Sequence, residues 1–321
     1  MATSARGVAA FGLHDKGRVR EDDQDYLLHW GAADLAAPAK EECLDADPES
    51  PRLSPVRFFV VADGMGGLAE GSRAARAACQ QAFGSFRSEA VSFNASLEPG
   101  LAHLTPSLAL AVQRVLVRAV EAANRRVWEQ AQGRSGSTLL TAAVCDHQLL
   151  MAAAGDCRAY LLRPDGPLEL LTADDNLAWE PTASGRMTSR EAAEDGLTSR
   201  LTRFLGRGPD LDPARYAVAL AGGERLLLCT DGLYSSFAEE GRIASLLRGG
   251  SPEEAVPRLI KGALERGGHD NITGLVVDIP RGERQRATVL IPATPIVRRQ
   301  PRLEARLRQW HEDAIAHDRE K

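Results

Sequence analysis

Five aspartates lie where apolar segments of this sequence begin or end, a pattern that could build a metal site. They come from distant parts of the chain and are Asp25, Asp63, Asp156, Asp231 and Asp270. Clustered buried carboxylates repel one another and lose hydration, so they need a compensating cation. Because no histidine or cysteine cluster accompanies them, this donor set favours Mg²⁺ or Mn²⁺ over Zn²⁺. One Asp-Gly pair alone is more often an ordinary turn, and only the five together indicate a metal.

Periodicity predicts a dense mixture of strands and helices around these aspartates. Besides a first strand at residues 26–28, strands are expected at 58–62, 138–145, 148–154, 158–162, 168–171, 214–220, 225–230 and 272–279. Helices are expected at 70–83, 107–130, 239–247 and 253–266. The strands from 138 to 171 follow one another with very short links, which join antiparallel neighbours. A meander framed by helices predicts an α+β fold rather than a doubly wound parallel sheet.

Composition describes an ordinary folded protein and excludes several classes. The chain has 321 residues, 44% of them hydrophobic and 26% charged, and a formal charge of −5, which does not favour nucleic-acid binding. No apolar stretch reaches the roughly 18 residues of a membrane span, and the N-terminus lacks a signal peptide's apolar segment. The five cysteines are scattered without CxxC spacing, which argues against a disulfide framework or a zinc site. We therefore expect a cytoplasmic protein.

Seven segments, taken in order, together resemble the metal-dependent serine/threonine phosphatases of the protein phosphatase 2C family (PPM type), in the bacterial style. They are 12–25 (GLHDKGRVREDDQD), 60–75 (VVADGMGGLAEGSRAA), 136–140 (GSTLL), 154–162 (AGDCRAYLL), 201–206 (LTRFLG), 228–233 (LCTDGL) and 268–277 (GHDNITGLVV). The resemblance implies a four-layer α-β-β-α sandwich, in which two packed antiparallel sheets are flanked by helices and the metal site lies in a cleft at one end.

The resemblance also implies a domain organisation. Residues 6–280 would form the phosphatase domain, with 34–55 as a surface insertion and 176–200 as a flap beside the cleft. Residues 281–321 would be a linker and C-terminal tail, in which a short helix is expected from Leu303.

By the same resemblance, the aspartates divide between two metal ions. Asp63 would bridge both ions, and the backbone carbonyl of Gly64 would bind one of them. Asp231 and Asp270 would hold the second ion. Asp25 would support this site by direct ligation or through a metal-bound water. The implied cofactors are two Mn²⁺ or Mg²⁺ ions.

Two further residues complete the implied site. Asp156 would bind a weaker third metal ion, and Arg20 matches the arginine that grips the substrate phosphate, for which a planar guanidinium is suited. The catalytic residues would then be Arg20, Asp63 and Asp231. The implied reaction is hydrolysis of phosphoserine and phosphothreonine by attack of a metal-bridging hydroxide. Phosphorylated proteins would be the partners, and the enzyme would reverse the action of a bacterial serine/threonine kinase. We expect a monomer.

Several positions depart from the family pattern. Asp174 matches a family aspartate and is expected near the metals, whereas Asp175 stands where relatives often have histidine. Met65 replaces the histidine of eukaryotic relatives, so no histidine acid is expected there. We interpret Trp179 as a packing anchor in the flap and His269 as an orienting or exposed side chain rather than a ligand.

Three other functions remain open at this stage. A catalytically weak or dead phosphatase-fold binding module would be expected to lose metal acids, yet all five are present. A metal-dependent phosphohydrolase of small metabolites would differ by preferring metabolites over phosphoproteins. The third is a phosphatase that acts on anti-sigma-factor antagonists within a stress-signalling cascade.

Overall fold

Two antiparallel sheets form the centre of the structure, a computed structural model that describes residues 8–30, 56–67, 69–94, 106–145 and 147–281. One sheet has the strand order β1 (Ala9–Asp15), β11 (Ile272–Asp278), β10 (Arg225–Cys229), β7 (Arg158–Leu162) and β8 (Leu168–Leu170). The other has the order β2 (Asp25–Trp30), β3 (Val56–Met65), β5 (Leu139–Cys145), β6 (Gln148–Ala154) and β9 (Ala214–Ala219), with β4 (Gly136–Ser137) paired to β3. Every pairing in both sheets is antiparallel.

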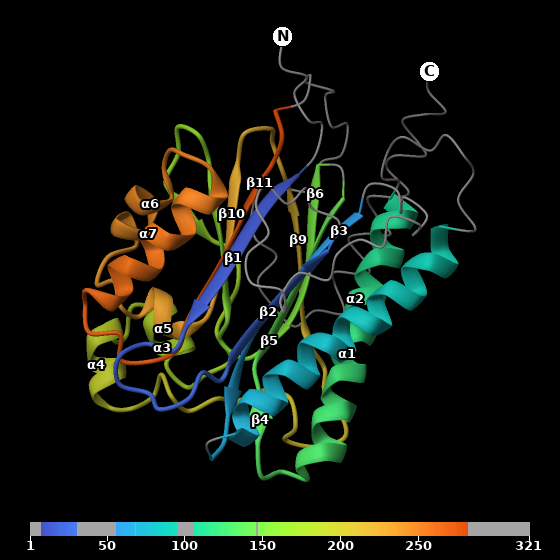
Figure 1. The fold of residues 1–321 in the computed structure, drawn as a ribbon, viewed down its shortest axis with the longest axis horizontal. Coiled ribbons are helices and arrows are strands. Elements are labelled where there is room, and N and C mark those ends of the chain that lie inside the picture. The colour runs from blue at the N-terminus through green and yellow to red at the C-terminus, as the bar shows by residue number, and fades with distance from the viewer. Residues whose placement is uncertain (1–7, 31–55, 68, 95–105, 146, 282–321) are drawn as a thin grey trace.

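Helices cover the outer face of each sheet (Figure 1). The long helices α1 (Ala69–Asn94) and α2 (Pro106–Ala131) pack against each other and on the six-stranded sheet. The helices α5 (Asp231–Tyr234), α6 (Glu240–Leu247) and α7 (Pro252–Leu264) pack on the five-stranded sheet. Two short helices, α3 (Trp179–Ala183) and α4 (Ser189–Glu194), lie in the connection between β8 and β9.

Three apolar layers hold the four structural layers together. Each central strand contributes to two of these apolar layers. In β3, for example, Val60 packs against α1 and α2, while the next residue, Val61, lies in the layer between the sheets. Successive side chains of a strand point to opposite faces, so a strand buried on both faces reads as a continuous apolar run. The third layer lies between the five-stranded sheet and α5–α7. The predicted four-layer α-β-β-α sandwich is therefore confirmed.

The prediction that the strands from 138 to 171 form one meander is wrong at one point. β5 pairs with β6, and β7 pairs with β8, but β6 and β7 belong to different sheets. The short link 155–157 therefore crosses between the sheets instead of forming a hairpin. Gly155 has a φ of +111°, a conformation that other residues rarely adopt, and it permits this crossing.

Other predicted elements agree with the structure within a few residues. The helix expected at 70–83 extends to Asn94, and strand β1 was not predicted. The predicted insertion at 34–55 and the tail helix from Leu303 lie outside the described residues. The expected flap at 176–200 contains α3 and α4. In the described part of the chain, no helix has the length and apolar character to cross a membrane.

Candidate metal centre

Four of the five aspartates come from neighbouring strand ends. Asp25 and Asp63 lie directly opposite each other in the β2–β3 pair. Asp231 begins α5, one residue after the end of β10, and Asp270 lies just before β11, the strand that pairs with β10. Asp156 lies in the link that crosses between the sheets. The fold thus gathers residues from both sheets at one end of the sandwich.

Two threonines attach Asp25 of one sheet to the other sheet. The hydroxyls of Thr230 and Thr273 each donate a hydrogen bond of 2.7 Å to Oδ2 of Asp25. Thr230 directly precedes Asp231, and Thr273 lies in β11. Neither threonine could be identified from the sequence, because a buried threonine beside or within a strand carries no signal of its own.

Glycines allow the surrounding loops to approach closely. A Cβ atom at Gly64 would lie 2.1 Å from the backbone oxygen of Gly71, and one at Gly232 would lie 1.9 Å from that of Asn271. Both distances are far inside van der Waals contact. Glycine is therefore required next to Asp63 and next to Asp231 by packing, in addition to any role of the Gly64 carbonyl.

Asn271 organises the loop that carries Arg20. Its side-chain amide donates to the backbone oxygens of Lys16 and Asp22, both at 2.9 Å, and its Oδ1 accepts from the backbone N–H of Gln24 at 2.9 Å. Asn271 is almost fully buried. In the sequence, Asn271 is marked only by its position next to Asp270. Its role in holding the Arg20 loop could not be inferred from that position.

The electrostatics are those of a crowded carboxylate cluster. Burial raises the pKa of Asp63 well above its usual value, and the charges of neighbouring aspartates raise it further. Burial also raises the pKa of Asp25 to about 7, against the opposing hydrogen bonds from Thr273 and Thr230. For Asp231, burial followed by the charge of Asp270 raises the pKa to about 6. Burial and the charge of Asp231 raise the pKa of Asp156 well above its usual range.

Two carboxylate oxygens in this cluster are buried without any hydrogen-bond partner, Oδ1 of Asp25 and Oδ1 of Asp231. An unsatisfied buried acceptor costs about 1–3 kcal/mol, and more when it is charged. A hard divalent cation would satisfy both oxygens and remove the mutual repulsion. The donor set, which consists of carboxylates and backbone carbonyls, fits Mg²⁺ or Mn²⁺.

Arg20 already lies beside this cluster. Its Nη2 donates to Oδ2 of Asp270 at 2.6 Å, and its side chain is 54% exposed, which places the guanidinium at the open side of the cluster. This hydrogen bond raises the pKa of Arg20. Within the described ranges, no three histidine, cysteine, aspartate or glutamate side chains form a ready-made metal cage.

Asp174 lies near the cluster, but an arginine occupies both of its carboxylate oxygens. Nε and Nη2 of Arg158 donate to them at 2.9 and 2.8 Å. The guanidinium of Arg158 also stacks over Tyr234, 3.8 Å from the ring centre. The hydroxyl of Tyr234 donates to the backbone oxygen of Asp156 at 3.2 Å. Asp174 therefore acts on the position of Asp156 through Arg158 and Tyr234.

Asp175 forms a second clamp on the same link. Arg203 donates to its two oxygens at 2.7 and 2.5 Å, and the backbone N–H of Gly155 donates to Oδ2 at 3.0 Å. The next residue, Asn176, accepts at Oδ1 from the backbone N–H groups of Ala178 and Trp179, at 3.1 and 3.0 Å. The start of the flap is thus attached to the link that carries Asp156.

The structure shows the exposure of His269 and Trp179, two side chains interpreted from the sequence. His269 is exposed, as expected. Trp179 is partly buried at the start of α3, where its backbone N–H donates to Oδ1 of Asn176.

The four layers and the carboxylate cluster define a class of protein, an α-β-β-α sandwich with a candidate site for divalent metals between its sheet ends. Comparison with known families gives the narrower assignment. The sequence profile of the family Protein phosphatase 2C matches residues 45–256. The chain belongs to the protein phosphatase 2C family.

Individual relatives agree with this assignment. The serine/threonine protein phosphatase PstP of Mycobacterium tuberculosis is 31% identical over 252 residues, which are 76% of this chain and 44% of PstP. Protein phosphatase PhpP of Streptococcus pneumoniae is 24% identical over 272 residues, 83% of this chain and 96% of PhpP. The chain thus spans less than half the length of PstP.

Solved structures share the fold. The PPM Ser-Thr phosphatase MsPP from Mycobacterium smegmatis, in complex with cacodylate, superposes with a TM-score of 0.64 at 29% identity, covering 86% of this chain and all of that one. The catalytic domain of PstP, in complex with two manganese ions, gives a TM-score of 0.62 at 26% identity, covering 85% of this chain and 99% of that one.

Proposed function

We propose that this chain is a metal-dependent phosphatase that hydrolyses phosphoserine and phosphothreonine in proteins. The observation that carries the proposal is the pair of buried, unpartnered carboxylate oxygens of Asp25 and Asp231 inside a cluster of acids. The relative PstP, whose catalytic domain binds two manganese ions, supports the same conclusion.

In this proposal, Asp63 would contribute to the binding of both of two Mn²⁺ or Mg²⁺ ions, and the Gly64 carbonyl to that of one of them. Asp231 and Asp270 would hold the second ion with support from Asp25. Asp156 would hold a weaker third ion, in a position that Asp174 and Asp175 help to fix through their arginines. When bound, the ions would supply an acidified water as nucleophile and neutralise charge on the phosphoryl oxygens.

The chain's own contribution to phosphate binding would come from Arg20. A guanidinium has five N–H donors, and the described contact with Asp270 uses only one nitrogen. The remaining donors, on a side chain that is more than half exposed, suit bidentate contact with phosphate oxygens. Asp270 holds Arg20 at this position before a substrate arrives.

The organisation of the chain follows from this assignment. Residues 6–280 would be the catalytic unit, acting as a cytoplasmic monomer, and residues 281–321 an appended tail. Its partners would be phosphorylated proteins, in particular the products of a serine/threonine kinase.

The decisive experiment measures hydrolysis of a phosphothreonine peptide by the purified chain, with Mn²⁺ and with a chelator. The variant Asp231→Asn is compared with Asp165→Asn, which removes an exposed carboxylate in the turn between β7 and β8. We expect metal-dependent turnover that Asp231→Asn abolishes and Asp165→Asn preserves. A folded chain that is inactive with every divalent metal would instead indicate a binding module. Faster hydrolysis of small phosphorylated metabolites than of the phosphopeptide would indicate that metabolites, not proteins, are the substrates.

A further inference from the structure

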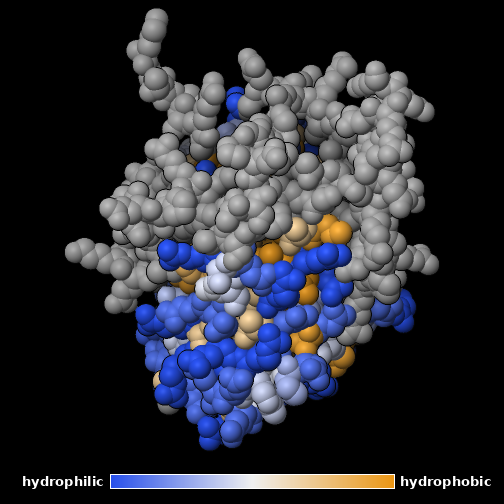
Figure 2. All heavy atoms as spheres, turned by 90° about the vertical axis from the view of Figure 1, so that its right-hand side faces the viewer, coloured by the Kyte–Doolittle hydropathy of each residue, from blue (hydrophilic) through white to orange (hydrophobic). Residues whose placement is uncertain are grey.

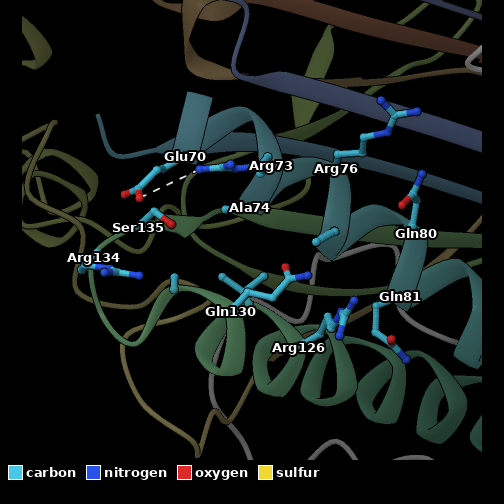
Figure 3. A pocket seen from close by; sticks show the side chains of 13 residues that line it. Glu70, Arg73, Ala74, Arg76, Gln80, Gln81, Arg126, Gln130, Arg134 and Ser135 are labelled. Carbon is cyan, nitrogen blue, oxygen red and sulfur yellow. Dashed lines mark ion pairs between the residues drawn. The ribbon is translucent and has the colours of Figure 1, made fainter. Parts of the chain in front are cut away.

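A basic groove runs between α1 and α2, outside the carboxylate cluster. It has a volume of about 670 Å³ and is lined by thirteen residues. Buried small residues, among them Ala74, Val127 and Ala131, lie along its lining between the two helices. Figure 3 shows that polar side chains from both helices surround it. Seen from the side of α1 and α2, the described surface of the molecule is largely hydrophilic (Figure 2).

The charge of the groove is opposite to that of the chain. Four arginines line it, and the chain as a whole carries −5; the four are Arg73, Arg76, Arg126 and Arg134. The one carboxylate in the lining is Glu70, which lies 3.9 Å from Arg73, a distance at the limit of an ion pair.

The other three arginines have no carboxylate partner among the described residues. Arg76 lies over the ring of Tyr26, 5.6 Å from its centre, and Arg126 lies 3.1 Å from the side-chain amide of Gln130. All four arginine side chains are exposed. Three arginines of the lining therefore have no described carboxylate partner, and although the side chain of Arg76 points away from α2 (Figure 3), those of Arg126 and Arg134 are available to bind an anion.

The groove begins at the loop that follows Asp63. Ser135, at one end of the lining, packs so closely on this loop that a Cβ atom at Gly66 would lie 2.8 Å from its own Cβ. The adjacent Gly136 pairs with Met65 in the β3–β4 ladder. One end of the groove therefore lies against the loop that follows β3, the strand that carries Asp63.

The length of the groove sets the size of its ligand. Its residues on α1 run from Glu70 to Gln81. At 1.5 Å per residue this stretch of helix is about 16 Å long. An extended peptide rises about 3.3 Å per residue, so about five residues would fill it.

We propose that this groove binds an acidic or multiply phosphorylated segment of the protein substrate, adjacent to the phosphoresidue that is hydrolysed. The inference rests on the proposed phosphatase function and adds a substrate preference to it. Continuity with the loop after Asp63 means that one extended chain can reach both places. Arginines spaced along the lining of one groove match a run of carboxylates or phosphates better than a single small anion.

The test compares two double variants, in and just after α2, that remove the same charge. Arg126→Gln with Arg134→Gln alters the groove, whereas Arg114→Gln with Arg125→Gln removes two exposed arginines that do not line it. The substrates are a small aryl phosphate and two phosphothreonine peptides, one flanked by five glutamates and one by five glutamines. Binding of a labelled five-glutamate peptide without phosphothreonine is measured separately by fluorescence anisotropy, without added metal.

We expect the groove variant to raise KM for the glutamate-flanked peptide about tenfold, since each exposed ion pair contributes up to about a factor of five. Its kcat and its rate with the aryl phosphate should not change, and its affinity for the labelled peptide should fall by a similar factor. The control variant should match the wild type. Equal losses in both variants would show a general charge effect and overturn the proposal, as would equal KM values for the two peptides with the wild type.

Failure of the proposed function would look different. If the aryl phosphate were not hydrolysed with any divalent metal, the phosphatase assignment would fall, while the anisotropy measurement would still test the groove by itself.

Discussion

Replacing Asp231 by asparagine is expected to have opposite effects on the metal-free and the metal-bound protein. In the metal-free protein the carboxylate is buried near Asp270, with Oδ1 unpartnered. Its pKa, raised from 3.8 to about 6, means that the charged form destabilises the fold at neutral pH. At about 1.4 kcal/mol per pKa unit the cost is up to about 3 kcal/mol. Asp231→Asn should recover roughly 1–3 kcal/mol of this, because the new amide also needs partners.

The pH dependence has a definite sign. A carboxyl group whose pKa is raised in the folded state destabilises the protein at pH values above that pKa. The advantage of Asp231→Asn should therefore be full at pH 8, shrink as the pH falls through about 6, and vanish near the ordinary value of about 4.

Metal reverses the comparison. A cation present at a hundred times its dissociation constant stabilises the folded protein by about 2.7 kcal/mol, which for a domain of this size raises Tm by roughly 5–10 °C. The wild type should show this shift with Mn²⁺ and Asp231→Asn should not. Urea and thermal unfolding in chelator and in Mn²⁺, with Asp165→Asn as the control, measure both effects. A variant that is less stable than the wild type in chelator at pH 8, or that keeps the full Mn²⁺ shift, would refute the reasoning.

Three further predictions concern other parts of the site. Arg20→Ala should raise KM for phosphopeptides with a smaller change in kcat, and an unchanged KM in steady-state kinetics would remove Arg20 from the phosphate site. Arg203→Gln should lower the free energy of unfolding by roughly 3 kcal/mol because it removes the guanidinium that balances the charge of the nearly buried Asp175; recovery in the double variant with Asp175→Asn, measured in urea, identifies the pair as the cause. Gly232→Ala should destabilise the fold or displace the site, because the new Cβ atom would lie 1.9 Å from the backbone oxygen of Asn271. The control Gly241→Ala, with open space around its Cβ position, should be neutral or stabilising by up to about 1 kcal/mol. Equal melting temperatures of the two variants would contradict the clash.

The strand ends that carry the aspartates could be predicted from the sequence because each follows or precedes a continuous apolar run. The apolar run before Asp231, for example, becomes β10 with the aspartate directly after Thr230. Asp63 differs, since it lies within β3 rather than after it. The reason is the β3–β4 pairing, which prolongs the strand to Met65 and involves a segment more than seventy residues away.

Contacts between distant segments could not be predicted in the same way. The arginine partners of Asp174 and Asp175 carry no periodic signal, because Arg158 lies at the start of β7 and Arg203 follows the flap, 16 and 28 residues from the acids that they bind. The basic groove is a similar case, because helical spacing places Arg73 and Arg76 on one face of α1 but says nothing of where Arg126 on α2 will lie. Only the packing of α1 on α2 turns these exposed arginines into one site.

The position of the carboxylates links metal binding to the packing of the two sheets. Asp25 and Asp63 belong to the six-stranded sheet, while Asp231 and Asp270 lie at the ends of β10 and β11 in the other. Repulsion among them acts against the packing, and in the metal-free protein the hydrogen bonds from Thr230 and Thr273 to Asp25 hold the two sheets together at this end. A cation shared by these acids would replace the repulsion with attraction across the same boundary. Binding of metal should therefore stabilise the contact between the sheets as well as complete the site, which is why a thermodynamic measurement can test the site independently of catalysis.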